Sequence, residues 1–170
     1  MRTTDDQPDR VNWRDVAPRP CPVASALDLF GDRWSMLIIR DVMNGVRRFD
    51  DLVARLGISR ATLADRLRRL QANGVLVTAD YDDARGRVRT EYRLSDGGWD
   101  LQFVLIALRE WGDKHVLGEG NEPLRLVNQE TGNGVRLELV DKDTGEIVER
   151  RTVRHAPGPA FRQVSSEGGT

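Results

Sequence analysis

The first half of the chain carries apolar residues at the spacing of a helix face. Residues three and four positions apart are apolar in four separate stretches, which predicts four short amphipathic helices. The predicted helices cover residues 22–30, 33–43, 50–56 and 60–72. Gly31-Asp32 separates the first two, and an Asn-Gly pair ends both the second and the fourth.

The spacing of apolar residues changes to a period of two after the fourth helix. Alternation over residues 75–81 and 88–94, around a polar turn at 82–86, predicts a β-hairpin. The alternation puts three apolar residues on one face of the first strand: Val75, Val77 and Ala79. One face of the second strand carries Val88, Thr90, Tyr92 and Leu94.

A long helix is predicted over residues 95–116. Its middle, LQFVLIALREW, is apolar nearly all round, and such a helix is buried on more than one side. After a linker at 118–121 the period is two again, which predicts a small β-sheet. Its strands cover residues 124–129, 135–140 and 147–153. The fold class is therefore α+β, mainly helical, with a small C-terminal β extension.

Composition divides the chain into four parts. Residues 1–18 are polar and without periodicity, so we expect a mobile N-terminal arm. The helices and the hairpin form one domain over residues 19–118, and the β extension covers 119–155. Residues 156–170 are rich in Pro, Gly and Ser, and we expect a flexible tail there.

Composition also excludes several classes of protein. The 170 residues include one cysteine, which excludes a disulfide framework within the chain and a zinc site built from cysteines. No apolar stretch approaches about 18 residues, so a transmembrane helix is excluded. The N-terminus has no apolar signal segment, and we expect a cytoplasmic protein. No acid–base pair, nucleophile–base set or glycine-rich phosphate loop indicates an enzyme.

Charge is distributed unevenly along the chain. The formal net charge is −1, yet residues 47–93 carry eleven arginines against seven acids. Two short stretches in this window, 59–69 and 84–93, are each +3. Local basic segments in a near-neutral protein are typical of a nucleic-acid footprint, with solvated surface charge as the alternative.

The predicted elements follow the order of a helix-turn-helix with a wing: a helix, a tight turn, a second helix and a hairpin with a basic tip. The second helix of such a pair meets the DNA base edges with its N-terminal residues. Ser59 precedes the helix at 60–72 and can cap it by accepting a hydrogen bond from the N–H of Thr62. The residues predicted to read bases are Arg60, Thr62 and Arg66. Inward leucines hold this helix on the core: Leu63, Leu67 and Leu70.

Two further groups of arginines flank this helix. Arg47 and Arg48 precede the third helix, whose positive N-terminal end also favours phosphate, and with Ser59 they are predicted to hold the backbone. The hairpin tip carries arginines that can reach a minor groove or flanking phosphates: Arg85, Arg87 and Arg89. The predicted partner is therefore double-stranded DNA.

At these residues the chain resembles the HxlR-type winged helix-turn-helix transcriptional regulators, within the MarR-like superfamily. The matching marks include Cys21-Pro22, Gly31-x-Arg33-Trp34, Gly45-x-Arg47-Arg48-Phe49, Ile58-Ser59, Leu63-x-x-Arg66-Leu67, Arg89-Thr90-Glu91-Tyr92 and Trp111-Gly112. The resemblance implies a DNA-binding homodimer, with the first and last helices at its interface. We therefore expect a repressor that binds a pseudo-palindromic operator. A winged-helix module that binds only protein is the alternative, which salt-dependent DNA binding would distinguish.

Some members of that family carry a C-terminal extension resembling a zinc ribbon. The related stretches LVNQETG (126–132) and LVDKDTG (139–145) lie where the metal-binding knuckles would be. The expected cysteines read Thr131, Asp141 and Thr144. Because Thr and a single Asp are poor zinc ligands, we expect a ribbon-like sheet without metal, and no cofactor.

Cys21 is a candidate for redox sensing. It stands directly before Pro22 at a predicted helix start, with Arg19 nearby, and both features lower the pKa of a thiol. Some relatives sense oxidants through a cysteine at this place. A half-buried, inert cysteine is the alternative.

Three aromatic residues are candidates for lining a pocket that binds a small-molecule effector. They are Trp34, Phe103 and Trp111. Aromatic residues on helical faces also form ordinary core, which is the alternative. A pocket between the long helix and a second subunit would combine both roles.

Overall fold

The computed structural model describes residues 11, 16, 20–118 and 120–161. The chain divides into two compact units: Val23–Leu137, and Met1–Pro22 with Glu138–Thr170. Most of the arm predicted for residues 1–18, and the tail beyond residue 161, lie outside the described residues. No described helix is long and apolar enough to cross a membrane.

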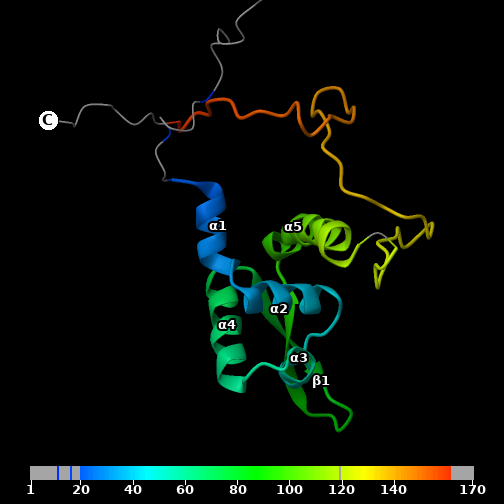
Figure 1. Cartoon of the computed structure of the whole chain (residues 1–170). Helices are drawn as coiled ribbons and strands as arrows, with labels where there is room; N and C mark the ends of the chain where they lie inside the picture. The colour runs from blue at the N-terminus through cyan, green and yellow to red at the C-terminus, as the bar shows by residue number, and fades with distance from the viewer. Residues whose placement is uncertain (1–10, 12–15, 17–19, 119, 162–170) are drawn as a thin grey trace, which may run out of the picture. The chain divides into compact units, whose positions relative to one another are not determined.

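The unit Val23–Leu137 contains a helical body and one hairpin (Figure 1). In chain order the elements are α1 (Pro22–Phe30), α2 (Arg33–Met43), α3 (Phe49–Leu56), α4 (Arg60–Ala72), β1 (Leu76–Asp82), β2 (Val88–Leu94) and α5 (Asp96–Gly112). A π-helical turn, Asp113–Leu117, extends α5. All five helices and both strands of the predicted winged-helix domain are therefore present.

Side-chain caps and a left-handed glycine define the helix ends. Asp32, Ser59 and Ser95 cap α2, α4 and α5 by accepting hydrogen bonds from backbone N–H groups of the first turn. The predicted cap of Ser59 on Thr62 is confirmed, with 3.1 Å between the amide nitrogen and the hydroxyl. Gly57 ends α3 at a φ of 61°, which only glycine adopts without cost, so the turn into α4 is tight.

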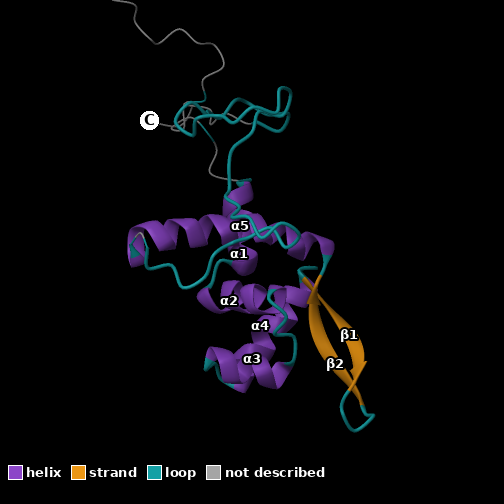
Figure 2. Cartoon of the chain, turned by 90° about the vertical axis from the view of Figure 1, so that its right-hand side faces the viewer, coloured by secondary structure: helices purple, strands orange, loops and turns teal. Residues whose placement is uncertain are grey.

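The core lies where α2, α3, α4 and the start of the hairpin meet. Its fully buried side chains include Ile38, Ile39, Leu52, Leu63, Leu67 and Leu70. Helix α2 lies between α5 on one side and α3 on the other, and α4 packs against α2 and α3 (Figure 2). The apolar stripe of α4 is thereby covered, as the leucine spacing predicted.

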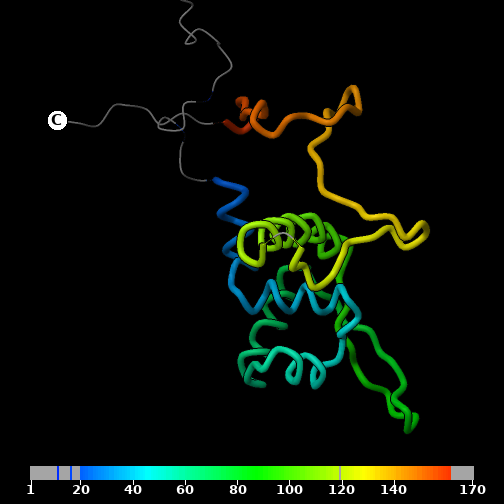
Figure 3. Tube along the Cα trace, turned by 45° about the vertical axis from the view of Figure 1, so that its right-hand side comes forward, coloured from blue at the N-terminus to red at the C-terminus, as the bar shows by residue number. Residues whose placement is uncertain are grey.

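The hairpin projects away from the helices (Figure 3). Leu76 pairs with Leu94, and both are buried at its base, while Val77 is exposed. Of the residues predicted to share an apolar face, Val75 is buried and Ala79 half-buried, so the prediction fails at Val77. Val75 belongs to the turn after α4, where its N–H donates to the carbonyl of Leu70, and the strand starts one residue later, at Leu76.

The C-terminal segment does not form the predicted sheet. In the described part of the chain, the strands expected at 124–129, 135–140 and 147–153 are reduced to isolated bridges, Val127 with Gly134 and Val140 with Ile147. Most apolar side chains of this segment, Leu124 and Ile147 among them, are exposed, and Leu126 and Val148 are half-buried. Alternation without a second layer to bury it does not stabilise a sheet.

The repeated stretches form two turns with the same hydrogen bonds. In the first, Oδ1 of Asn128 accepts from the N–H groups of Glu130 and Thr131. In the second, Oδ1 of Asp141 accepts from those of Asp143 and Thr144, which lowers the pKa of Asp141. At Thr131, Asp141 and Thr144, the positions of the expected cysteines, side-chain oxygens accept backbone hydrogen bonds within the turns.

Candidate nucleic-acid interface

The first turn of α4 combines an exposed polar side with a buried apolar side. Arg60 and Ser59 are exposed, and Thr62 is partly so, whereas Leu63 in the same turn is fully buried. The hydroxyls of Ser59 and Thr62 lie 2.8 Å apart and hydrogen-bond to each other. This end of the helix can therefore enter a groove while the opposite side stays on the core.

Two residues of α3 hold Arg60. Its Nη1 lies 2.7 Å from Oδ1 of Asp50. Its guanidinium carbon lies 4.8 Å from the centre of the Phe49 ring. The first residue of α4 is thus oriented by two side chains of α3.

Arg66 is placed differently from the sequence prediction. Its side chain is 23% exposed rather than outward, and its Nε lies 3.2 Å from Oδ1 of Asp32, an ion pair without hydrogen-bond alignment. It also pairs with Asp65. Burial acts to raise the pKa of Asp32, but hydrogen bonds from Ser35 and Trp34 and the charge of Arg66 outweigh it and lower that pKa. Arg66 therefore ties α4 to the start of α2.

Arg47 and Arg48 lie at the start of α3, next to the hairpin. Nη1 of Arg47 lies 3.9 Å from Oε1 of Glu91, and its carbonyl accepts a hydrogen bond from the N–H of Tyr92. The Arg48 guanidinium lies over the ring of Tyr81, 4.4 Å from its centre. These contacts join α3 to both strands.

Asp83 organises the arginines of the hairpin tip. Its Oδ1 accepts hydrogen bonds from the N–H groups of Arg85 and Arg87, and its Oδ2 accepts from Nε and Nη2 of Arg87. Nε of Arg89 lies 3.5 Å from the same oxygen. These hydrogen bonds, led by the Arg87 amide, lower the pKa of Asp83 to about 2.

A hollow of about 350 Å³ separates the start of α3 from the hairpin. Arg48 and Arg89 line it, together with the acids Asp50, Asp51 and Asp83. Sequence reasoning brought out the arginines and missed these acids. The four-residue spacing of Asp83 and Arg87 was a usable signal, whereas nothing in the sequence joins Asp50 to Arg60.

The sequence places this chain in a known family of regulators. The model of the HxlR-like helix-turn-helix family matches residues 29–119. The chain belongs to the HxlR-like helix-turn-helix family. It is 37% identical over 140 residues to the HTH-type transcriptional regulator Rv3095 of Mycobacterium tuberculosis, covering 82% of this chain and 87% of that protein. It is therefore a DNA-binding transcriptional regulator.

Solved structures of related proteins have the same fold. The crystal structure of the candidate transcription factor PA1607 is 36% identical, with a TM-score of 0.72 over 83% of this chain and 97% of that one. That of PA1374 from Pseudomonas aeruginosa is 33% identical, with a TM-score of 0.57 over 82% and 94%. Both alignments extend well beyond the residues that the family model matches.

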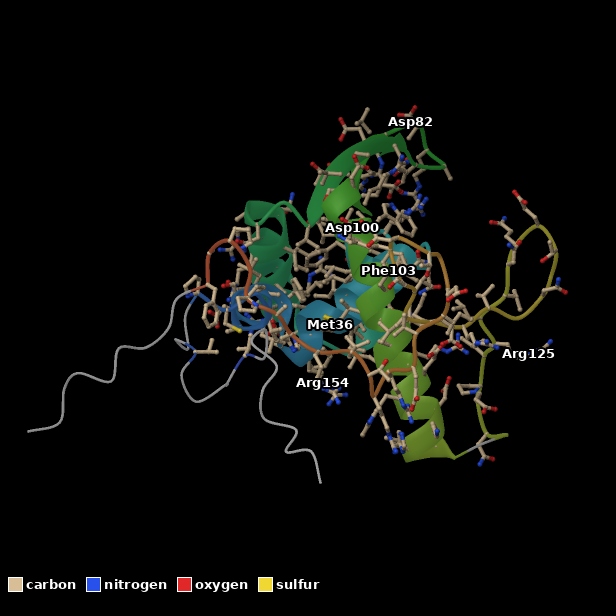
Figure 4. The ribbon with its side chains drawn as sticks, turned by 90° about the horizontal axis from the view of Figure 1, so that it is seen from above. Met36, Asp82, Asp100, Phe103, Arg125 and Arg154 are labelled. Atoms are coloured by element: carbon tan, nitrogen blue, oxygen red, sulfur yellow. The ribbon has the colours of Figure 1, made fainter. Side chains whose placement is uncertain are left out.

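The residues predicted to sense a signal are dispersed in this HxlR-like regulator. Cys21 is a half-buried free thiol directly before α1, and its response to oxidants stays a prediction. Trp34 packs partly against the core, while Phe103 and Trp111 are 62% and 61% exposed on α5. Figure 4 labels Phe103 on this helix. Two pockets in the described part of the chain, one lined by Glu110 and Asp113 and one by Arg48 and Asp83, contain none of the three aromatic residues.

Proposed function

We propose that this HxlR-like regulator is a repressor that binds a pseudo-palindromic operator as a homodimer. One observation carries the proposal. The exposed start of α4 presents Arg60 and Thr62 on a helix whose opposite side is fully buried, with the arginine-tipped hairpin beside it. A helix held in this way fits the major groove while the wing reaches the adjacent backbone.

The contacts of the arginines support different roles. Arg60 and Thr62 read base edges, and Arg66, which is tied to Asp32, contributes from the side of the helix. Ser59, Arg47 and Arg48 hold phosphates. Arg85, Arg87 and Arg89 contact DNA from the wing, where Asp83 keeps two of their side chains together.

The apolar surface of α5 supports the homodimer. Phe103, Val104, Leu108 and Trp111 are exposed along a helix in which Leu101 is buried. Exposed apolar surface of this kind on one helix is typical of a subunit interface. In a dimer with recognition helices about 34 Å apart, both would enter successive major grooves on one side of the duplex.

A direct test uses the full-length protein and a library of randomised duplexes. The wild type should enrich a sequence with two related half-sites. Arg60→Ala should lose about 1–3 kcal/mol on that sequence and relax one base position. Arg87→Ala should weaken binding to all sequences alike and flatten the salt dependence.

The same test separates the proposal from a protein-interaction module. Such a module would bind no duplex in a salt-dependent way, and neither substitution would change its behaviour.

A reporter gene that carries the enriched sequence between promoter and start site tests whether the protein represses or activates transcription. Repression predicts lower expression with the wild type than with Arg60→Ala, and higher expression would make it an activator.

A further inference from the structure

The guanidinium of Arg60 is restrained on one edge and on one face. Asp50 occupies Nη1, and the Phe49 ring lies against the plane of the group. Phe49 itself packs against the core, so this platform is fixed to the fold. Arg60 is nevertheless 67% exposed and Asp50 80% exposed. The arginine is therefore oriented and still accessible from solvent.

Stability accounts for little of the carboxylate at this place, although Asp50 lies in the first turn of α3, where the helix dipole slightly favours an acid. An exposed ion pair contributes little to folding. An acid beside a DNA-facing arginine also weakens the attraction of that surface for phosphate. The pair Asp50–Arg60 is thus unfavourable for general DNA affinity, and its effect lies in the direction in which the arginine points.

The restraint leaves the other edge of the guanidinium available. Among the described residues, Nε and Nη2 of Arg60 have no hydrogen-bond partner. Two N–H groups in one plane are what an arginine uses to bind O6 and N7 of guanine. A phosphate, in contrast, accepts hydrogen bonds from many directions and needs no such orientation.

Arg48 provides a comparison in the same interface. Its guanidinium also lies on an aromatic ring, that of Tyr81, but no carboxylate pairs with it in the described part of the chain. The positive charge of Arg48 is thus not offset by an ion pair among the described residues, as suits a residue that holds phosphate. The difference between Arg48 and Arg60 is therefore the acid, Asp50.

We propose that Asp50 is a specificity-determining residue of the DNA interface. With Phe49 it positions Arg60 for a base edge and opposes contact of Arg60 with phosphate. The inference rests on the proposed function, because it assigns Asp50 a part in the operator contact of Arg60.

The test compares Asp50→Asn with Asp51→Asn. Both remove one negative charge from the first turn of α3, but Asp51 has no ion-pair or hydrogen-bond partner among the described residues. The probes are the duplex that the full-length wild type enriches and a shuffled duplex of the same composition. Asp50→Asn should lower the ratio of the two affinities about fivefold or more, at the base position that Arg60 reads. Asp51→Asn should strengthen both affinities alike and leave the ratio unchanged.

Two further variants distinguish positioning from a general structural effect. Phe49→Leu keeps an apolar side chain and the net charge but removes the aromatic platform, and it should lower the same ratio. In an Arg60→Ala background, Asp50→Asn should no longer change the ratio, because the residue that it positions is absent.

The outcomes separate this inference from the proposed function. A wild type that enriches no duplex overturns both. A wild type that enriches a sequence, with Asp50→Asn keeping the same base preference, overturns the role of Asp50 alone. The role of Asp50 is also overturned if Asp50→Asn lowers the affinity ratio equally in the wild type and in the Arg60→Ala background.

Discussion

Helices α4 and α5 flank the same hairpin but bury their apolar residues to very different extents. Every leucine of α4 is at most 1% exposed, although the helix is largely polar. α5 is longer and more apolar, yet Phe103, Leu108 and Trp111 are exposed. The apolar residues of α4 are covered by its own chain, whereas the described residues leave these side chains of α5 uncovered.

This difference separates folding from assembly. Covering a large apolar side chain contributes about 1.5–3 kcal/mol, which α4 has already gained from α2 and α3. The outer side of α5 has not gained it in a single chain. Substitutions in α4 should therefore change the equilibrium between folded and unfolded protein. Substitutions on the exposed side of α5 should change the equilibrium between monomer and dimer.

The largest effect is expected in the core beneath the recognition helix. Leu67→Ala should lower the free energy of unfolding by about 2–5 kcal/mol, because it leaves a cavity where a fully buried side chain was. Chemical denaturation followed by circular dichroism measures the loss. Leu108→Ala, on the exposed side of α5, is the matched control. Its effect should depend on protein concentration, and an equal, concentration-independent loss would contradict the comparison.

A charge on the outer side of α5 should act on assembly. Phe103→Glu puts a carboxylate in the proposed interface and should raise the dimer dissociation constant by about 30-fold or more. Light scattering across a dilution series gives the mass, and circular dichroism should show the helices retained. A wild type that is monomeric at micromolar concentration would refute the dimer itself.

The sequence predicts α4 more completely than α5. The bounds of α4 were predicted correctly because a serine cap, a leucine stripe and an Asn-Gly stop agree with one another. The apolar run of α5 predicted a helix but not which side its own chain would cover. Nothing in the pattern distinguishes an exposed residue such as Phe103 from a buried one such as Leu101.

Two other errors have local physical causes. Residue Val75 continues the apolar alternation on paper, but its hydrogen bond to Leu70 makes it part of a turn. The alternation after residue 120 is typical of a sheet, yet none of the residues that the structure describes forms a layer that covers Ile147. Asp50 could not be found from sequence, since it meets Arg60 only through the fold.

A smaller effect on stability is expected at the start of α2. Asp32→Ala removes a helix cap and the partner of Arg66, and should cost about 1–2 kcal/mol. Because the pKa of Asp32 is lowered on folding, this stabilisation is full above its ordinary pKa and disappears as the pH falls through the folded pKa. The difference between variant and wild type should therefore be constant near neutral pH and shrink below about pH 4.

A matched acid in the first turn of α5 tests whether this loss is specific. Asp96 stands after the serine cap of that helix and has no ion pair among the described residues. Asp96→Ala should lower stability by less than about 0.5 kcal/mol, since only the helix dipole is affected. Equal losses for Asp32→Ala and Asp96→Ala would mean that neither the cap nor the Arg66 contact of Asp32 contributes to stability.

The smallest effect is expected at the hairpin tip. The tip packs on neither α4 nor α5, so a substitution there should change only the local hydrogen bonds. Asp83→Asn should leave the unfolding transition unchanged but speed the exchange of the Arg85 and Arg87 amides, which donate to the carboxylate. In the wild type the pKa of Asp83 is lowered from 3.8 to about 2, so the turn keeps its hydrogen bonds as the pH falls past 3.8 and loses them only near 2. Carbon NMR of the Asp83 carboxyl measures this midpoint directly. A midpoint near 3.8 would mean that Arg87 and Arg89 are not gathered by Asp83, and that the wing presents its arginines to DNA independently of one another.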